Sequence, residues 1–128
     1  MKITRLDHFV LTTEHLDGCL NFYSDVLGMD IDRNNNRYAL RFGKQKINIH
    51  TRKVEFLPAA RYSQCGSLDI CLVIDEPIEV VYQELKSKGV ALETGIVERN
   101  GAMGRMKSIY LRDSDGNLIE LCMYEETD

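Results

Sequence analysis

The sequence repeats one order of structural elements, strand–helix–strand–strand–strand, in its two halves. Each half opens with a short apolar run, continues with apolar residues at helical spacing up to a glycine, and closes with three strand-like segments. His8 in the first opening strand and Asp69 in the second stand at matching places, 61 residues apart. The predicted strands are residues 6–11, 29–33, 38–42, 46–51, 68–74, 91–94, 106–112 and 117–124.

One helix is predicted in each half. In the first half, apolar residues recur at helical spacing over residues 16–27, and Gly28 follows where a left-handed C-terminal cap belongs. In the second half the same spacing covers residues 78–85, and a glycine again follows. Asp75 is expected to cap this second helix, with Pro77 in its first turn.

A single helix cannot close the core of such a half. It covers one face of a small sheet and leaves the other face and an edge open, so the two sheets are expected to combine. A chain of 128 residues is long enough to bury a core without disulfides or a structural metal. We therefore expect one domain over residues 1–128, with a first module at about 1–57 and a second at about 66–125.

Strand alternation predicts which residues face away from the helices. In the last strand of the first half, Ile47 and Ile49 face the helix, and in the last strand of the second half Ile119 and Leu121 do so. The residues on the opposite parity are Lys46, Asn48 and His50 in the first half and Leu118, Glu120 and Cys122 in the second. A helix-free face that carries His and Glu is either a site or half of an interface.

Composition excludes several classes of protein. The sequence has 16 Lys and Arg against 20 Asp and Glu, a formal charge of −4, and no basic run longer than two residues, so no nucleic-acid partner is expected. No apolar stretch approaches the ~20 residues that a bilayer span needs, so no membrane partner is expected. The N-terminus opens directly into an alternating pattern rather than a signal sequence. The four cysteines form no CxxC pair and are interpreted as small hydrophobic residues of a cytoplasmic protein.

Three segments carry a resemblance that covers nearly the whole chain. They are LDHFVL at residues 6–11, FYSDVLGM at 22–29 and SIYLRDSDGNLIEL at 108–121. On these segments the chain resembles the vicinal oxygen chelate superfamily, which includes glyoxalase I, extradiol dioxygenases and bleomycin-binding proteins, and within it the short glyoxalase-domain proteins. The resemblance implies an α+β fold in which two βαβββ modules form a U-shaped cleft of mixed sheet.

The resemblance also implies one divalent metal ion, held by end-strand residues of both modules. His8 matches the first-strand ligand of module one, and Glu120 matches the last-strand carboxylate of module two. The last-strand position of module one falls on His50, with Asn48 as the other inward-facing choice. The first-strand position of module two, often His in the family, is Asp69 here. This set is rich in hard oxygen donors and favours Mn²⁺, Mg²⁺ or Fe²⁺ over Zn²⁺ or Ni²⁺. It also fits a site that has lost its metal.

Each candidate ligand has a simpler interpretation. His8 fits a strand histidine that bonds to the backbone, and His50 fits a strand end at the solvent boundary. Asp69 fits a hydrogen-bond acceptor in the cleft. Glu120 lies among apolar neighbours, where an acid is seldom buried without a partner. The sequence therefore supports Glu120 and His8 as ligands more strongly than the other two.

The function implied is that of a metal-dependent enzyme acting on a small oxygen-chelating substrate, either a glyoxalase-like lyase or isomerase or a dioxygenase-related enzyme. The metal would chelate two neighbouring substrate oxygens and stabilise an enediolate-like state, with Glu120 as the proton-transfer base. Arg99, Arg105 and Tyr110 border the cleft in this family and are candidate substrate contacts. A chain with two modules argues mildly against an extradiol dioxygenase, which usually has four.

Two alternatives remain open at this point. One is a metal-free small-molecule binding protein, like the antibiotic-sequestering members that confer bleomycin resistance. The other is a stress- or virulence-associated protein whose cleft has lost its chemistry. A homodimer is expected for the enzyme and for the binding protein, because small members of the superfamily build or complete the cleft between chains.

Overall fold

The structure is a computed structural model and describes residues 1–52 and 55–125. Internal contacts divide the chain into two compact units. Unit 1 contains Met1–Ser67 and the short turn Ser114–Gly116, and unit 2 contains Leu68–Asp113 and the chain from Asn117 onward. No helix in the described ranges is long and apolar enough to cross a membrane.

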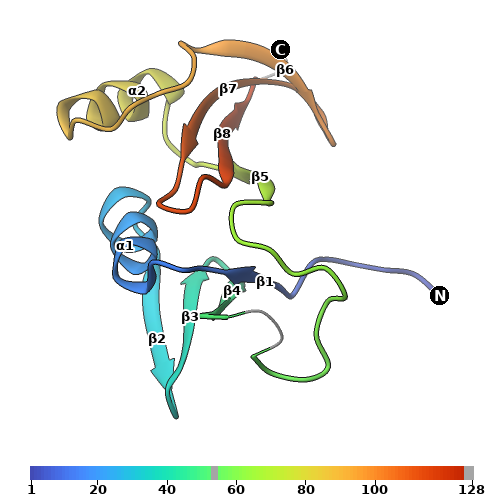
Figure 1. The fold of residues 1–128 in the computed structure, drawn as a ribbon. Coiled ribbons are helices and arrows are strands. Elements are labelled where there is room, and N and C mark those ends of the chain that lie inside the picture. The colour runs from blue at the N-terminus through green and yellow to red at the C-terminus, as the bar shows by residue number, and fades with distance from the viewer. Residues whose placement is uncertain (53–54, 126–128) are drawn as a thin grey trace. The chain divides into compact units, whose positions relative to one another are not determined.

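Unit 1 is a four-stranded mixed sheet with one helix (Figure 1). The sheet has the order β1-β4-β3-β2, in which β1 and β4 are parallel and the other pairs are antiparallel. The helix continues into a π-helical turn, η1. The elements are β1 (His8–Thr12), α1 (Leu16–Asn21), η1 (Phe22–Val26), β2 (Asp30–Asn34), β3 (Arg37–Phe42) and β4 (Gln45–His50).

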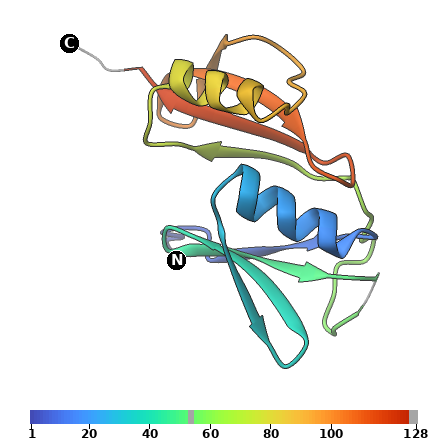
Figure 2. The same ribbon diagram turned by 90° about the vertical axis from the view of Figure 1, so that its left-hand side faces the viewer.

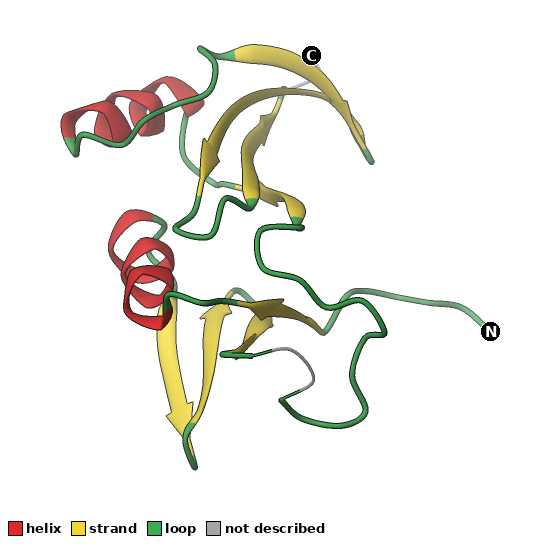
Figure 3. Ribbon diagram, viewed as in Figure 1, coloured by secondary structure: helices red, strands yellow, loops and turns green. Residues whose placement is uncertain are grey.

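Unit 2 repeats this architecture (Figure 3). Its sheet has the order β5-β8-β7-β6, with β5 and β8 parallel and the other pairs antiparallel. The elements are β5 (Asp69–Val73), α2 (Ile78–Ser87), β6 (Val97–Gly101), β7 (Gly104–Arg112) and β8 (Leu118–Tyr124). The predicted βαβββ order is therefore confirmed in both halves of the chain.

Each unit buries one apolar side of its sheet, and its polar strand residues stand on the other side. Ile47 and Ile49 are buried in unit 1, where α1 runs alongside the sheet (Figure 2), and Ile119 and Leu121 are buried in unit 2. The predicted alternation is confirmed in β4, because the residues of opposite parity line a pocket. In β8, Glu120 is half-buried, but Cys122, which has the same parity, is buried. We call this second side of each sheet its open face.

The two helix ends follow the glycine pattern, but the start of the second helix differs from the prediction. Gly28 and Gly89 adopt φ of +77° and +75°, the left-handed conformation that favours glycine after a helix. The prediction that Asp75 caps the second helix is wrong. Pro77 itself is the N-cap residue, with φ −57° and ψ 133°, and α2 begins at Ile78 without a side-chain cap.

The prediction of a strand at residues 91–94 is also wrong. Only Leu92 pairs there, in an isolated bridge with Leu111. The strand in this region is β6, whose sequence VERNG is polar and shows no alternation of apolar residues. It forms because the β6–β7 hairpin pairs it with β7, a tertiary cause that local periodicity does not reveal.

The turn between β7 and β8 is fixed by two buried polar residues. The N–H of Asn117 donates to Asp113 Oδ1 (2.9 Å), and Asn117 Nδ2 donates to Asp113 Oδ2 (2.8 Å). Asn117 Oδ1 in turn accepts the N–H of Leu68 at 2.9 Å, immediately before β5. The tip of the turn belongs to unit 1, where Asp115 accepts the hydroxyl of Thr13 at 2.5 Å.

Candidate functional site

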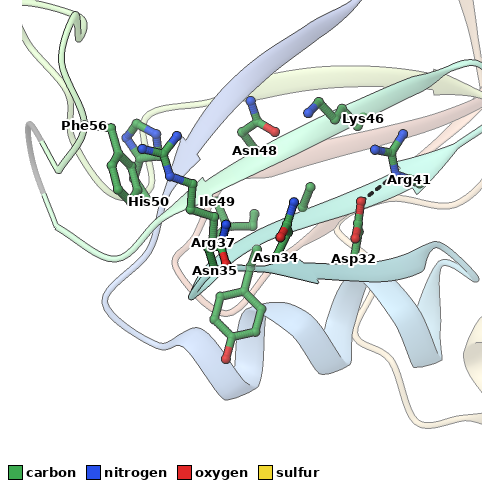
Figure 4. A pocket seen from close by; sticks show the side chains of 12 residues that line it. Asp32, Asn34, Asn35, Arg37, Arg41, Lys46, Asn48, Ile49, His50 and Phe56 are labelled. Atoms are coloured by element: carbon green, nitrogen blue, oxygen red, sulfur yellow. Dashed lines mark hydrogen bonds and ion pairs between the residues drawn. The ribbon is translucent and has the colours of Figure 1, made fainter.

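The open face of unit 1 holds a pocket of about 660 Å³ over strands β2, β3 and β4 (Figure 4). Asn48 and Ala39 are paired across β4 and β3 at its middle. His50 and Phe56 lie at one end, and Lys46 lies farther along β4. The pocket therefore lies on a β-sheet, and the small side chain of Ala39 forms its bottom at the centre.

Aromatic contacts organise one end of this pocket. The guanidinium of Arg37 lies 3.9 Å from the ring centroid of Phe56. The rings of Phe56 and His50 meet edge to face, with centroids 5.2 Å apart. Phe56 belongs to the segment after β4, which is fastened because Glu55 accepts the hydroxyl of Thr51 at 2.5 Å. The ring of Phe56 thus contacts both Arg37 and His50 at the same end of the pocket.

His8 lies at the start of β1, on the open face of unit 1 opposite Lys46. Its side chain is 45% exposed, and its Nδ1 lies 2.7 Å from Asp7 Oδ1. This hydrogen bond is the largest cause that lowers the pKa of Asp7 below its usual value. A ring that donates from Nδ1 presents its other nitrogen as a lone pair, the tautomer that a metal ligand requires.

The strand register decides which residue of β4 is equivalent to Glu120 of β8. In unit 2, Glu120 stands opposite Cys71, two residues after Asp69. In unit 1, the position two residues after His8 is Val10, and Val10 pairs with Asn48. His50 pairs with Thr12, and Thr12 lies four residues after His8 on β1, a separation of about 13 Å along the strand. Asn48 is thus the counterpart of Glu120, and His50 as a ligand stays a prediction.

Glu120 lies on the open face of unit 2, within a set of polar side chains. The Ser108 hydroxyl donates to Glu120 Oε2 at 2.6 Å, and Ser108 is fully buried. Asp69 and Glu120 project from the same face of the parallel pair β5 and β8, because Asp69 pairs with Leu118 and Cys71 pairs with Glu120. Glu120 is therefore held at one oxygen by a protein donor.

Two of the three predicted substrate contacts share this face. The Nε of Arg99 donates to the hydroxyl of Tyr110 at 3.0 Å, and Tyr110 pairs with Glu120 across β7 and β8. Burial is the main cause that raises the pKa of Tyr110, the bond from Arg99 opposes it, and the Glu120 carboxylate adds to it. Tyr110 thus lies between Arg99 and the Glu120 carboxylate on this face.

The third predicted substrate contact, Arg105, is placed differently. It has the parity of Ile109 and Leu111, the buried residues on the other side of β7. Its guanidinium is ion-paired with Glu98, and its Nε lies 3.9 Å from Glu125. Its role in substrate binding stays a prediction.

The cysteines include a pair that sequence reasoning interpreted as ordinary apolar residues. None of the four is disulfide-bonded. Cys122 is buried, but Cys71 is exposed beside Glu120. Although Cys71 is exposed as a residue, partial desolvation of its thiol raises the pKa of Cys71 to about 12, with Cys122 and Glu120 adding to the effect. Cys71 therefore stays a neutral thiol on the open face of unit 2.

Within residues 1–52 and 55–125, no group of three or more His, Cys, Asp or Glu side chains is gathered as a metal site. Each unit by itself supplies one pair of candidate donors. In unit 1 the pair is His8 and Asn48, and in unit 2 it is Asp69 and Glu120.

The family follows from a comparison with known sequences. The sequence profile of the Glyoxalase/Bleomycin resistance protein/Dioxygenase superfamily matches residues 5–121. The chain belongs to this superfamily. The resemblance to the vicinal oxygen chelate superfamily is thereby confirmed, together with its α+β fold of two βαβββ modules.

Two relatives of this superfamily member match it over nearly its whole length. The virulence protein STM3117 of Salmonella typhimurium strain LT2 is 45% identical over 125 residues, which span 97% of this chain and 87% of that protein. Its crystal structure matches this chain with a TM-score of 0.94 and 44% identity, covering 98% of this chain and 100% of the other. A glyoxalase domain-containing protein of Mycosarcoma maydis, RDO1, is 42% identical over 127 residues, 98% of this chain and 72% of that protein.

Several residues of the two open faces were not singled out from the sequence. Strand alternation could have identified Arg37 and Ser108, because each alternates onto the open face of its sheet. Asp7 was accessible as the residue beside a candidate ligand. Phe56 lies in an irregular segment after β4, and no local pattern indicates that it packs against Arg37.

Proposed function

We propose that this superfamily member is a metal-dependent enzyme that acts on a small substrate with two neighbouring oxygen atoms. One observation carries the proposal. The two units place chelating side chains at the same two strand positions, His8 and Asn48 in unit 1, and Asp69 and Glu120 in unit 2. A repeated fold has no structural need for polar residues at both equivalent positions of both copies, so a shared chemical task explains the pattern.

The donor set fits a divalent ion. It contains one imidazole nitrogen, two carboxylates and one amide oxygen, which favours Mn²⁺, Mg²⁺ or Fe²⁺ over Zn²⁺ or Ni²⁺. Asp7 holds the His8 ring by its Nδ1, the orientation that ligating histidines receive from a neighbouring carboxylate. When bound, such an ion polarises the substrate oxygens and stabilises the negative charge that develops on them.

Glu120 is the residue proposed to move a proton. Its Oε2 is held by Ser108, so its other oxygen is the one available for a proton of the substrate. Tyr110 and Arg99 continue from the carboxylate as a chain of polar contacts and orient substrate oxygens on this face. Arg105, the third predicted substrate contact, is ion-paired with Glu98 and lies near Glu125, so a contact with substrate would compete with these pairs.

We also propose that the chain works as a homodimer in the cytoplasm. The absence of a disulfide among its four cysteines supports a reducing compartment. Small members of the superfamily assemble in pairs, and a twofold dimer is the commonest assembly for a chain of this size. Light scattering at micromolar concentration tests this point, because a mass near that of one chain excludes the dimer.

The test of the proposed function is elemental analysis of protein purified without chelator or affinity metal. We expect near-stoichiometric metal in the wild type and its loss in both His8→Ala and Glu120→Gln. His15→Ala is the matched control, because His15 is exposed, precedes α1 and belongs to neither donor pair. Loss from only one of the two variants contradicts a shared task, and equal metal in all four proteins overturns the proposal.

A second candidate function is a metal-free binding protein. One observation favours it: the pocket of unit 1 is complete within one unit and lined by groups that bind small molecules directly. Turnover of a hemithioacetal or catechol panel that needs added metal excludes this candidate. Protein that stays metal-free after incubation with Mn²⁺, Fe²⁺ and Zn²⁺, yet binds small molecules, supports it.

A further inference from the structure

The pocket of unit 1 is positively charged in a chain that is negatively charged. The whole sequence carries a formal charge of −4. The residues lining the pocket include three cations, Arg37, Arg41 and Lys46, against one carboxylate, Asp32. A concave site of one sign attracts ligands of the other, because its field is focused by the walls around it.

Only one of the three cations is neutralised by the protein. The Nε of Arg41 lies 2.8 Å from Asp32 Oδ2, which accounts for that pair of charges (Figure 4). Across the described part of the chain, no carboxylate lies within ion-pair distance of Arg37 or Lys46. In the described residues, Arg37 and Lys46 therefore form no ion pair, although Lys46 acts through space on Asp7, and one cation lies toward each end of the pocket.

Arg37 is held ready for an oxyanion. Its guanidinium lies over the ring of Phe56 at 3.9 Å, and the same ring is packed against His50. Contact with an aromatic face does not use the N–H groups in the guanidinium plane, which are the donors that grip a carboxylate or phosphate in pairs. The stacked arginine thus loses less freedom on binding than a solvated one.

Space and polarity at the middle of the pocket suit the rest of such a ligand. Ala39 presents only a methyl group opposite Asn48, so the floor is low between the two charged ends. Asn48 offers both donors and an acceptor to oxygen atoms of a ligand. Asn34 adds a further amide at the rim. These groups match an organic anion better than an apolar molecule.

We propose that this pocket binds the anionic group of a small organic oxyanion, with Arg37 as the principal anchor and Lys46 as the second charge. The shared chemistry is a carboxylate or a phosphate ester. The inference rests on the proposed function in one respect, since it names anionic molecules as the substrate class of the enzyme. The site itself uses only protein groups, so it is testable without metal.

The experiment titrates the chelator-treated full chain with three probes that share one ring, benzoate, phenyl phosphate and benzamide, and follows backbone amide shifts by NMR. We expect an anion to shift the amides of β3 and β4, and added salt to weaken its binding. Benzamide, which has the same ring without the charge, is expected to bind at least about tenfold more weakly. Stronger binding of benzoate assigns a carboxylate, and stronger binding of phenyl phosphate assigns a phosphate.

Matched variants locate the site. Arg37→Gln is expected to weaken binding of the better anion about tenfold or more, and Lys46→Gln to weaken it by a smaller factor. The controls are Arg33→Gln and Lys44→Gln, exposed cations of the same unit that do not line the pocket. Both controls are expected to bind the anion as the wild type does.

Three results overturn the inference: no shift with either anion, equal binding of benzamide, or equal weakening by Arg37→Gln and Arg33→Gln. The metal content of the Arg37→Gln variant distinguishes failure of the anion-binding inference from failure of the proposed metal-dependent function. If the Arg37→Gln variant keeps wild-type metal content but loses anion binding, the anion site is supported independently of the metal site. Lost metal with intact anion binding means that Arg37 acts on the ion, and the inference is wrong.

Discussion

The two units share one topology but carry opposite chemistry on their open faces. At equivalent ladder positions, Asn48 faces Ala39 across the strands of unit 1, whereas Glu120 faces Tyr110 in unit 2. The small residue leaves a hollow with cations around it, and the tyrosine occupies the same place beside a carboxylate. A repeated backbone thus supplies equivalent positions, and different residues at those positions give the two open faces different charge and shape.

The units also differ in how their last strand is attached. Gln45, one residue before Lys46, donates from its Nε2 to the carbonyl of Leu6 at 2.9 Å. Asn117, one residue before Leu118, instead accepts the N–H of Leu68 at its Oδ1, and it is fully buried and also bonded to Asp113. The bond from Gln45 is exposed to solvent, whereas the bond to Asn117 belongs to a network that includes buried side chains.

The largest predicted effect tests that difference in stability. Asn117→Ala removes the acceptor of the part-buried Leu68 N–H and the side-chain donor to Asp113, while the main-chain N–H of residue 117 still donates to Asp113, so we expect a loss of about 2 kcal/mol in the free energy of unfolding. Gln45→Ala removes an exposed bond and is expected to cost less than about 1 kcal/mol. Urea unfolding at neutral pH measures both, and equal losses in the two variants would show that burial does not separate the links.

Local patterns predicted much of this molecule, because alternation and helical spacing are properties of short segments. Ile47 and Ile119 were placed on the buried sides of their strands for that reason. The polar segment of β6 was missed because its pairing with β7 creates it. The choice between His50 and Asn48 stayed open in the sequence, because it depends on the register of a parallel pair, and a shift of two residues preserves the face.

The candidate ligands of the site could be predicted from the sequence, but the residues that contact and orient them could not. Each candidate ligand is a chemically distinct residue on a recognisable strand, as His8 and Glu120 are. The groups that hold those ligands lie on other strands or in irregular segments. Ser108 meets Glu120 across β7 and β8, and Phe56 meets Arg37 from beyond β4. Such contacts follow from the tertiary structure alone.

The next prediction concerns the carboxylate of unit 2. Ser108→Ala removes the buried hydroxyl that donates to Glu120, and a hydrogen bond to an ionised group contributes about 1.5–3 kcal/mol. Because Glu120 keeps some contact with water, we expect a loss of about 1.5 kcal/mol in the free energy of unfolding. Ser24→Ala is the comparison, since Ser24 donates at 2.7 Å to the uncharged Leu20 carbonyl within its own helix. A larger loss at Ser24 than at Ser108 contradicts the assignment.

A substitution from one unit into the other tests the hollow directly. Ala39→Tyr gives unit 1 the side chain that unit 2 carries at Tyr110, and we expect it to fill the floor of the pocket. Binding of the anionic probe should weaken about tenfold, equivalent to ~1.4 kcal/mol. Ala39→Ser, which adds one atom, should bind as the wild type does. Unchanged binding by the tyrosine variant would mean that the ligand lies elsewhere on the sheet.

The smallest predicted effect concerns the segment that carries Phe56 to the pocket of unit 1. Burial opposes ionisation of Glu55, but hydrogen bonds from the Thr51 side chain and backbone outweigh it and hold its pKa below the usual 4.5. A carboxyl with a lowered pKa stabilises the fold above the unfolded value, and this contribution is lost as the pH falls through the folded pKa. Glu55→Gln should therefore cost less than about 1 kcal/mol at pH 7, because the bonds are exposed. The difference from the wild type should shrink below pH 4.5, and a constant difference down to pH 2 would show that the ionised carboxylate is not what fastens Phe56 over Arg37.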